Sequence, residues 1–167
     1  MSDAPYSAFG QVMKQRDLKL QTLETTRQLC EVDRELIKDI LKTVFARRMA
    51  GDIEGMLEFL APDIVVFPET TWGHARYSRK IVGKDAVREV FGQRHINYVN
   101  LGLKLHRILI DGDQAVVHRT TTIRERGSAI GYTFDSIDFF RFRDGLIVEF
   151  CELPDGSAYD AVINFPH

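Results

Sequence analysis

The chain has 167 residues, of which 44% are hydrophobic and 28% charged, as in one globular domain with its own core rather than in a disordered or fibrous protein. Its formal net charge is -2, so there is no overall positive field to hold nucleic acid or an anionic membrane. No apolar run approaches the ~20 residues that a membrane-spanning helix needs, and the start, MSDAP, lacks the basic and apolar regions of a signal peptide. A soluble cytoplasmic protein is therefore expected.

The two cysteines, Cys30 and Cys151, lie far apart in segments with an apolar pattern. Neither belongs to a C-x-x-C pair, which argues against a zinc site or a disulfide framework. We expect both to be buried free thiols in a reducing compartment.

Residues 1–30 are predicted to form a polar N-terminal arm, because Leu18, Leu20 and Leu23 are too irregularly spaced to define a strong apolar face. The arm could be a helix that packs on a partner subunit or on its own domain. Residues 31–167 are predicted to form a single domain. Within it, an amphipathic helix is predicted from Glu31 to about Met49, because apolar residues recur there at helical spacing.

Further elements follow from turn signals and from changes of period. Gly51 is predicted to end the first helix, and Asp52 to cap a second helix that Pro62 stops. A β-branched and aromatic run predicts a strand over 64–67. Residues 69–81 are predicted to form a long loop.

A third helix is predicted to open at Gly83-Lys84-Asp85, with four strands after it. Turn signals separate alternating runs and indicate antiparallel hairpins. The strands are expected over 101–110, 114–125, 131–143 and 146–153, and residues 157–165 as a short tail of one or two helical turns. Helices first and strands last predict an α+β fold, in which a curved antiparallel sheet wraps around a long helix.

Two stretches carry a family resemblance. Residues 50–63, AGDIEGMLEFLAPD, resemble the A-G-D-x-x-G-x-x-x-x-F-A-x-D passage common to ketosteroid isomerase and the SnoaL-like polyketide cyclases. Residues 137–150, IDFFRFRDGLIVEF, resemble the D-x-F-R-F-x-x-G-K-I-x-E hairpin of the same families. Over about residues 31–160 the chain is thus similar to the nuclear transport factor 2-like (NTF2-like) superfamily, which implies a cone-shaped, cystatin-like roll with a pocket for a small apolar molecule.

The resemblance also implies a homodimer, because the similar families usually pair through the convex face of the sheet. On this chain Ile137, Phe139 and Ile147 are expected to point outward. Exposed together in a monomer, they would leave an apolar patch of the kind that marks an interface.

The resemblance places Asp138 on the ketosteroid isomerase aspartate that stays protonated and donates to a developing oxyanion. The residues support such an environment, because residues two apart in a strand share a face of the sheet. Asp138 would therefore lie among Phe134, Phe140 and Phe142, where desolvation raises the pKa of a carboxyl group unless a cation or donor is near. Asp138 is predicted as a catalytic acid or electrostatic element.

Two other isomerase positions are not kept. The tyrosine that helps to hold the oxyanion is replaced by Val44, and the general-base aspartate before a proline is replaced by Phe67 before Pro68. Because the isomerisation needs a base to move the proton, true ketosteroid isomerase activity is not expected.

His106 is predicted as the proton partner of Asp138, because it interrupts an aliphatic alternation and histidine titrates near neutrality. A two-residue turn at Gly112-Asp113 would put His106 opposite Arg119, and a three-residue turn would put it opposite His118. A surface or structural role for His106 is the competing interpretation.

The remaining candidates have competing interpretations too. Glu152 either points into the pocket near its mouth or is a solvated charge at the rim. Trp72, His74 and Tyr77 could form a lid or pocket wall, a dimer contact or plain loop packing. The predicted substrate-binding set is Trp72, Tyr77, Phe67, Phe134, Phe140, Arg119, His118 and Glu152.

Basic residues at 76, 79, 80, 124 and 126 could meet an anionic substituent on a ligand, or simply be solvated. No metal is expected, since the histidines and Glu152 lack a tight ligand spacing. The sequence thus predicts a cofactor-independent acid/base enzyme of the isomerase, cyclase, dehydratase or epoxide hydrolase type, acting on a small cyclic apolar substrate. The alternative is a non-catalytic module of the same fold that binds a ligand or dimerises.

Overall fold

The computed structural model describes residues 4–67 and 80–155, and side chains within residues 4–32 only for 14, 15 and 18–25. The chain divides into two compact units, Met1–Leu36 and Ile37–His167, and the sheet belongs to the second. Trp72, His74, Tyr77 and the tail at 157–165 lie outside the described residues.

The first helix, α1, runs from Ala4 to Ala50 and so begins well before the predicted residue 31. In the first unit Leu18, Leu20 and Leu23 are exposed. The domain boundary at residue 30 stays a prediction. In the second unit α1 buries five residues of the expected apolar stripe, Ile37, Ile40, Leu41, Val44 and Phe45. Leu36, which was also expected on the stripe, lies in the first unit and is exposed, and the side chain of Val32 lies outside the described residues.

The end of α1 follows the sequence signals. Gly51 has a φ of 74°, a left-handed conformation that glycine adopts without the steric penalty of a β-carbon. The Asp52 side chain accepts a hydrogen bond from the Gly55 backbone N–H at 2.9 Å, so it caps α2 (Ile53–Leu57) as predicted.

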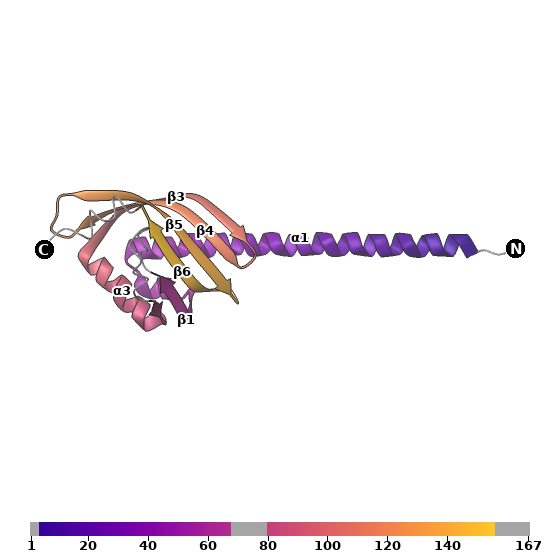
Figure 1. Ribbon diagram of the computed structural model, residues 1–167, viewed down its shortest axis with the longest axis horizontal. Helices are drawn as coiled ribbons and strands as arrows, with labels where there is room; N and C mark the ends of the chain where they lie inside the picture. The colour runs from indigo at the N-terminus through magenta and orange to yellow at the C-terminus, as the bar shows by residue number, and fades with distance from the viewer. Residues whose placement is uncertain (1–3, 68–79, 156–167) are drawn as a thin grey trace. The chain divides into compact units, whose positions relative to one another are not determined.

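The sheet has six strands in the order β2-β1-β6-β5-β4-β3, and its neighbours are antiparallel except for the parallel pair β1 and β6. Beyond β1 (Leu60–Phe67) and the two-residue β2 (Ile81–Val82), the long strands are β3 (Tyr98–Asp111), β4 (Gln114–Glu125), β5 (Gly131–Arg143) and β6 (Leu146–Pro154). The sheet curves over the last turns of α1, and α3 (Lys84–Asn97) lies against its open side (Figure 1). The predicted α+β fold is confirmed.

Four details between α2 and β2 differ from the predictions, and the first is that β1 begins at Leu60 instead of residue 64. The second helix ends at Leu57, and Pro62 lies inside β1 instead of stopping a helix. Proline is tolerated there because the pairing of β1 with β6 is irregular between Leu60 and Val65. The predicted loop 69–81 also reaches into β2, which pairs with β1.

The two faces of β5 follow the predicted alternation. Phe134, Ser136, Asp138, Phe140 and Phe142 are all buried, and the residues between them are exposed. Phe140 stacks on Phe150 at 4.8 Å and meets Phe45 edge-on at 5.9 Å, so this face of β5 forms the core between sheet and α1.

Of the three residues that were expected to point outward from the sheet, two do so. Ile137 and Phe139 are exposed, but Ile147 is fully buried. The pairing of β5 with β6 shifts between Arg141 and Phe142, and Ile147 then pairs with the inward residue Phe142. Since the shift reverses the faces of the strand beyond it, Ile147 joins the core. The homodimer itself stays a prediction.

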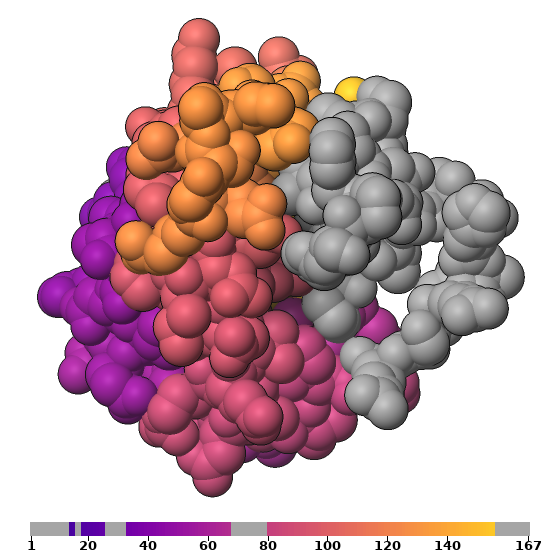
Figure 2. Space-filling view, turned by 90° about the vertical axis from the view of Figure 1, so that its left-hand side faces the viewer, coloured from indigo at the N-terminus to yellow at the C-terminus, as the bar shows by residue number. Residues whose placement is uncertain are grey.

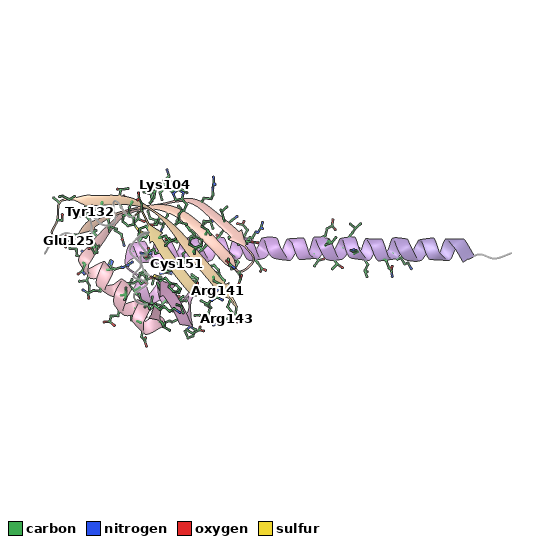
Figure 3. All side chains as sticks on the ribbon, viewed as in Figure 1. Lys104, Glu125, Tyr132, Arg141, Arg143 and Cys151 are labelled. Atoms are coloured by element: carbon green, nitrogen blue, oxygen red, sulfur yellow. The ribbon has the colours of Figure 1, made fainter. Side chains whose placement is uncertain are left out.

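Ion pairs at the turn end of β5 are exposed. Arg143 donates to both carboxylate oxygens of Asp63, at 2.8 and 2.9 Å, and Arg141 donates to Glu149 at 2.8 Å. Both arginines are labelled in Figure 3. Exposed pairs of this kind contribute little to stability, so they are suitable controls for a buried cluster.

Candidate functional site

A cavity of about 220 Å³ lies between the last turns of α1, helix α3 and the inner face of the sheet. Its apolar wall consists of Phe45, Met49, Ile53, Phe91, Leu103, Ile123, Phe134 and Pro154. Its polar wall consists of Arg48, Arg94, His95, Tyr98, Asn100, Arg119, Thr121 and Glu152. An apolar hollow with a few convergent polar groups is the usual form of a small-molecule site.

The surface near this cavity is built by α3, by the start of β3 that follows it directly, and by the turn between β4 and β5. Figure 2 shows α3 below the start of β3, with the turn between β4 and β5 above them. The Arg126 backbone N–H donates to the Asn97 carbonyl at 2.8 Å, and the Arg126 guanidinium donates to the His95 carbonyl at 3.1 Å. These hydrogen bonds attach the β4–β5 turn to the end of α3.

Arg119, on the inner face of β4, is the centre of the polar wall. Its Nε donates to Oδ2 of Asp138 at 2.5 Å, and its Nη2 donates to Oε1 of Glu152 at 2.5 Å. Its Nη1 donates to the hydroxyl of Thr121. Arg119 is 2% exposed and Asp138 is fully buried. A planar guanidinium bound on all sides is held in one orientation.

Glu152, on the inner face of β6, gathers two more guanidinium groups. Its Oε1 also lies 2.7 Å from Nη2 of Arg48, and its Oε2 accepts from Nη1 of Arg94 at 3.1 Å. Arg48 and Arg94 both lie over the ring of Phe91, at 4.8 and 5.4 Å from its centroid. Three cations and two carboxyl groups therefore meet here. We call them the arginine cluster, which consists of Arg48, Arg94, Arg119, Asp138 and Glu152.

The pKa values of the two carboxyl groups in the arginine cluster are shifted in opposite directions. Burial raises the pKa of Asp138 to about 6, because desolvation of its carboxylate outweighs the attraction of Arg119. Burial also acts to raise the pKa of Glu152, but Arg48, Arg119 and Arg94 outweigh it and hold the pKa below its usual range. Glu152 is thus a permanent carboxylate at neutral pH, whereas Asp138 can hold a proton.

His95, in the last turn of α3, lines the cavity. Its Nδ1 is buried and has no hydrogen-bond partner among the described residues. Its ring lies against Gly51, where a β-carbon would come within 2.1 Å of Cε1 of His95. The glycine that ends α1 therefore also makes room for this imidazole.

The predicted site residues are only partly brought together. Glu152, Arg119 and Phe134 line the cavity. Glu152 is 4% exposed, so the interpretation as a solvated rim charge is wrong. Asp138 contacts Arg119 from behind and does not itself line the cavity.

Two predicted wall residues lie elsewhere. Phe140 is in the core. Phe67 is half-buried beneath the ammonium group of Lys80, at 5.9 Å, and is not part of the cavity wall. Trp72 and Tyr77 lie outside the described residues.

His106 and His118 do not share a face of the sheet with Asp138, because His118 pairs with the outward residue Ile137. The turn at Gly112-Asp113 has two residues, which would put His106 opposite Arg119 on the inner face. A β-bulge intervenes, because Leu105 pairs with Arg119 and Arg107 pairs with His118. The extra residue, His106, turns outward and stacks on His118 at 4.7 Å.

Sequence reasoning missed Arg48, Arg94 and His95. The available signal was helical spacing: Arg48 is three residues after Phe45 on the inward stripe of α1, and Arg94 is three residues after Phe91 on α3, so each shares a face with a core aromatic residue. His95 carries the same signal, because it is four residues after Phe91, but its contact with Gly51 could not be read from the sequence.

Comparison with known proteins identifies the class to which this fold belongs. The solved structures that resemble it include an LEH-like epoxide hydrolase from M. tuberculosis, with a TM-score of 0.59 and 18% identity over 72% of this chain and 83% of that one. An NTF2-like protein from Burkholderia xenovorans LB400 has a TM-score of 0.61 and 19% identity over 78% and 97%. TsrD from Streptomyces laurentii has a TM-score of 0.60 and 18% identity over 77% and 94%. The fold is therefore NTF2-like.

The family is given by the sequence itself. Residues 41–150 match the SnoaL-like domain, and the chain belongs to that family. A search of curated protein sequences gives no match. Among the described residues, no helix combines the length and the apolar character that crossing a membrane requires.

Proposed function

We propose that this protein is a cofactor-independent acid/base enzyme that acts in the described cavity on a small, largely apolar molecule bearing a reactive oxygen. The isomerase, cyclase, dehydratase and epoxide hydrolase types all meet this description. One observation carries the proposal: a single buried guanidinium, Arg119, joins two carboxyl groups whose pKa values are shifted in opposite directions, at the wall of an apolar cavity. Such divergent pairs are typical of acid/base sites.

The arginines supply the electrostatic part of the proposed chemistry. Arg48, Arg94 and Arg119 all line the cavity, so three guanidinium groups face the space in which a substrate would bind. Negative charge that develops on a substrate oxygen would be stabilised there without reorganisation, since the groups are already fixed. Removal of one such donor in known enzymes lowers the rate by about 10²–10³-fold.

His95 is the proposed proton carrier. It lies in the cavity wall next to Arg94 in the chain, and its Nδ1 has no hydrogen-bond partner among the described residues. Histidine is the side chain that most often transfers protons in enzymes. In an isomerisation, the imidazole takes a proton from carbon, the electron pair moves to the carbonyl oxygen beside the guanidinium groups, and the proton returns to another carbon.

Asp138 is proposed as a positioning residue. It fixes Arg119 through Nε and Nη2, at 2.5 and 3.3 Å, and acts on a substrate only through that guanidinium. Glu152 faces the cavity as a carboxylate and could orient a water molecule toward an epoxide carbon. The neighbour described as an LEH-like epoxide hydrolase makes epoxide opening one of the reactions to test.

The experiment uses the full chain and two probes. A set of cyclic ketones in D₂O is followed by ¹H NMR for exchange of the protons next to the carbonyl, and a cyclic terpene epoxide is followed for diol formation. His95→Gln is expected to lower the exchange rate about 10²-fold, and Arg94→Gln to lower either rate by a similar factor. Arg143→Gln, at the exposed pair with Asp63, is the matched control and should leave the rates unchanged.

A second candidate is a binding module without chemistry. The observation in its favour is that Arg119 is saturated by Asp138, Glu152 and Thr121, which also describes a purely structural ion cluster. Probes that raise the Tm of the chain, yet show neither exchange nor diol above the buffer rate, would reject the enzyme and support this module.

A further inference from the structure

The outer face of the sheet carries a second group of functional side chains, away from the cavity. His106 on β3, His118 on β4 and Asp135 on β5 come from three adjacent strands, and one ligand atom from each lies within 4.8 Å of the other two. We call these residues the outer histidine cluster. Lys104, which pairs with Thr120 and is labelled in Figure 3, lies on the same stretch of β3.

The β-bulge on β3 creates this cluster. Leu103 and Leu105 pack against the core before the bulge, and Ile108 and Ile110 pack against it afterwards. The bulge therefore leaves His106 on the outer face, where it stacks on His118. Bulges re-aim side chains in this way and are common next to functional sites.

We propose that the outer histidine cluster binds a divalent transition-metal ion of the zinc type. Imidazole nitrogen and carboxylate oxygen are standard ligands of such ions, and two histidines with one carboxylate leave coordination positions open for water or another ligand. Zinc–ligand bonds of about 2.0–2.1 Å place neighbouring ligand atoms about 3.3 Å apart. Nε2 of His118 and Oδ2 of Asp135 already lie 3.5 Å apart.

The hydrogen bonds around Asp135 favour this arrangement. The Thr120 hydroxyl donates to Oδ1 of Asp135 at 2.5 Å and also lies 2.6 Å from Nε2 of His106. On metal binding, Nε2 of His106 would exchange Thr120 for the ion, while the threonine continues to orient the carboxylate. Partners that orient a ligand in this way commonly contribute 10–100-fold to metal affinity.

The ligands can converge because they are accessible. The side chains of His118 and Asp135 are 41% and 57% exposed, so small rotations are not blocked by packing. The strands themselves are held by the pairing of β4 with β5 and by the pairing of β3 with β4 on both sides of the bulge at His106. The spacing of the ligands in sequence gives no hint of the site, since each comes from a different strand.

The test is calorimetric titration of the chelator-treated full chain with ZnCl₂. One ion per chain is expected, with a rise in Tm, because the ion binds the folded state and joins three strands. His106→Ala, His118→Ala and Asp135→Asn should each weaken binding about 10-fold or more. Asp111→Asn, an exposed carboxylate on β3 outside the cluster, is the matched control.

A second measurement identifies the ligands directly. Zn²⁺ should shift the side-chain ¹⁵N signals of His106 and His118 in the NMR spectrum, and Co²⁺ should give visible absorption that the His118→Ala variant loses. Asp135→Asn keeps the shape of the side chain, so a loss of binding in that variant would not reflect misfolding. Absence of binding at micromolar zinc, or binding unaffected by all three substitutions, would overturn the proposal.

Discussion

The ring of His95 occupies the space that a β-carbon at position 51 would need. A Cβ built on Gly51 falls 2.1 Å from Cε1 and 2.3 Å from Nε2 of His95, closer than atoms can approach without displacement. The glycine in the AGD motif therefore has two roles: it ends α1 in a left-handed conformation, and it leaves room for a cavity-wall histidine.

An alanine in the left-handed conformation costs about 1–2 kcal/mol. Gly51→Ala is expected to lower the free energy of unfolding by more than this, because the His95 ring must also move. Chemical denaturation measures the loss, and the side-chain NMR signals of His95 should shift. Gly112→Ala is the control, since Gly112 has a φ of 58° but nothing within 4 Å of its added Cβ. Equal losses in the two variants would contradict the contact.

Arg119→Met should destabilise the protein by about 3–5 kcal/mol, because it leaves Asp138 and Glu152 without the cation between them in a buried site. Adding Asp138→Asn to this variant should recover part of the loss by removing an unpaired buried charge. Arg143→Met breaks only an exposed pair and should leave the denaturation midpoint nearly unchanged. A small effect of Arg119→Met would mean that water reaches the arginine cluster.

The raised pKa of Asp138 predicts a pH dependence of stability. Its usual pKa of 3.8 applies to the unfolded chain and about 6 to the native state, so between these values the native state binds more protons. The free energy of unfolding should therefore fall as pH rises through this window, by up to about 1.4 kcal/mol per pH unit.

Glu152 acts in the opposite sense. Its native pKa lies below its usual 4.5, so its stabilisation is present above that pH and is lost as the pH falls further. Of these two carboxyl groups, therefore, only Asp138 changes the free energy of unfolding with pH between about pH 4.5 and 6. Asp138→Asn should remove the fall in stability there, as measured by denaturation at several pH values. Parallel curves for the two proteins would contradict the raised pKa.

Two neighbouring phenylalanines on β5 test the two faces of the sheet. Phe140 is 4% exposed and Phe139 is 45% exposed. Phe140→Ala should lower the free energy of unfolding by about 3–5 kcal/mol, because it leaves a cavity between Phe45 and Phe150. Phe139→Ala should change it by less than about 1 kcal/mol in the monomer. The reverse order would place the core on the other face.

The sequence by itself determined the features that depend on neighbouring residues. The two-residue alternation of β5 put Asp138 on one face with Phe134, Phe140 and Phe142, and the motif resemblance made that face the inner one. The turn signals at Gly112 and Gly145 located the hairpins. The alternation is a local property, because an extended strand places successive side chains on opposite faces whatever it pairs with. The SnoaL-like family was also recognisable from two short motifs.

Only the tertiary structure decided which polar groups meet. Arg119, Asp138 and Glu152 come from three strands and Arg94 from a helix, and a bulge that no local pattern predicts moved His106 from the proposed pair with Asp138 to the outer face. Register and bulges are set by long-range pairing, where one extra residue reverses the face of a strand. A buried charge likewise depends on partners that are distant in sequence, because only the folded chain brings them close enough to offset desolvation.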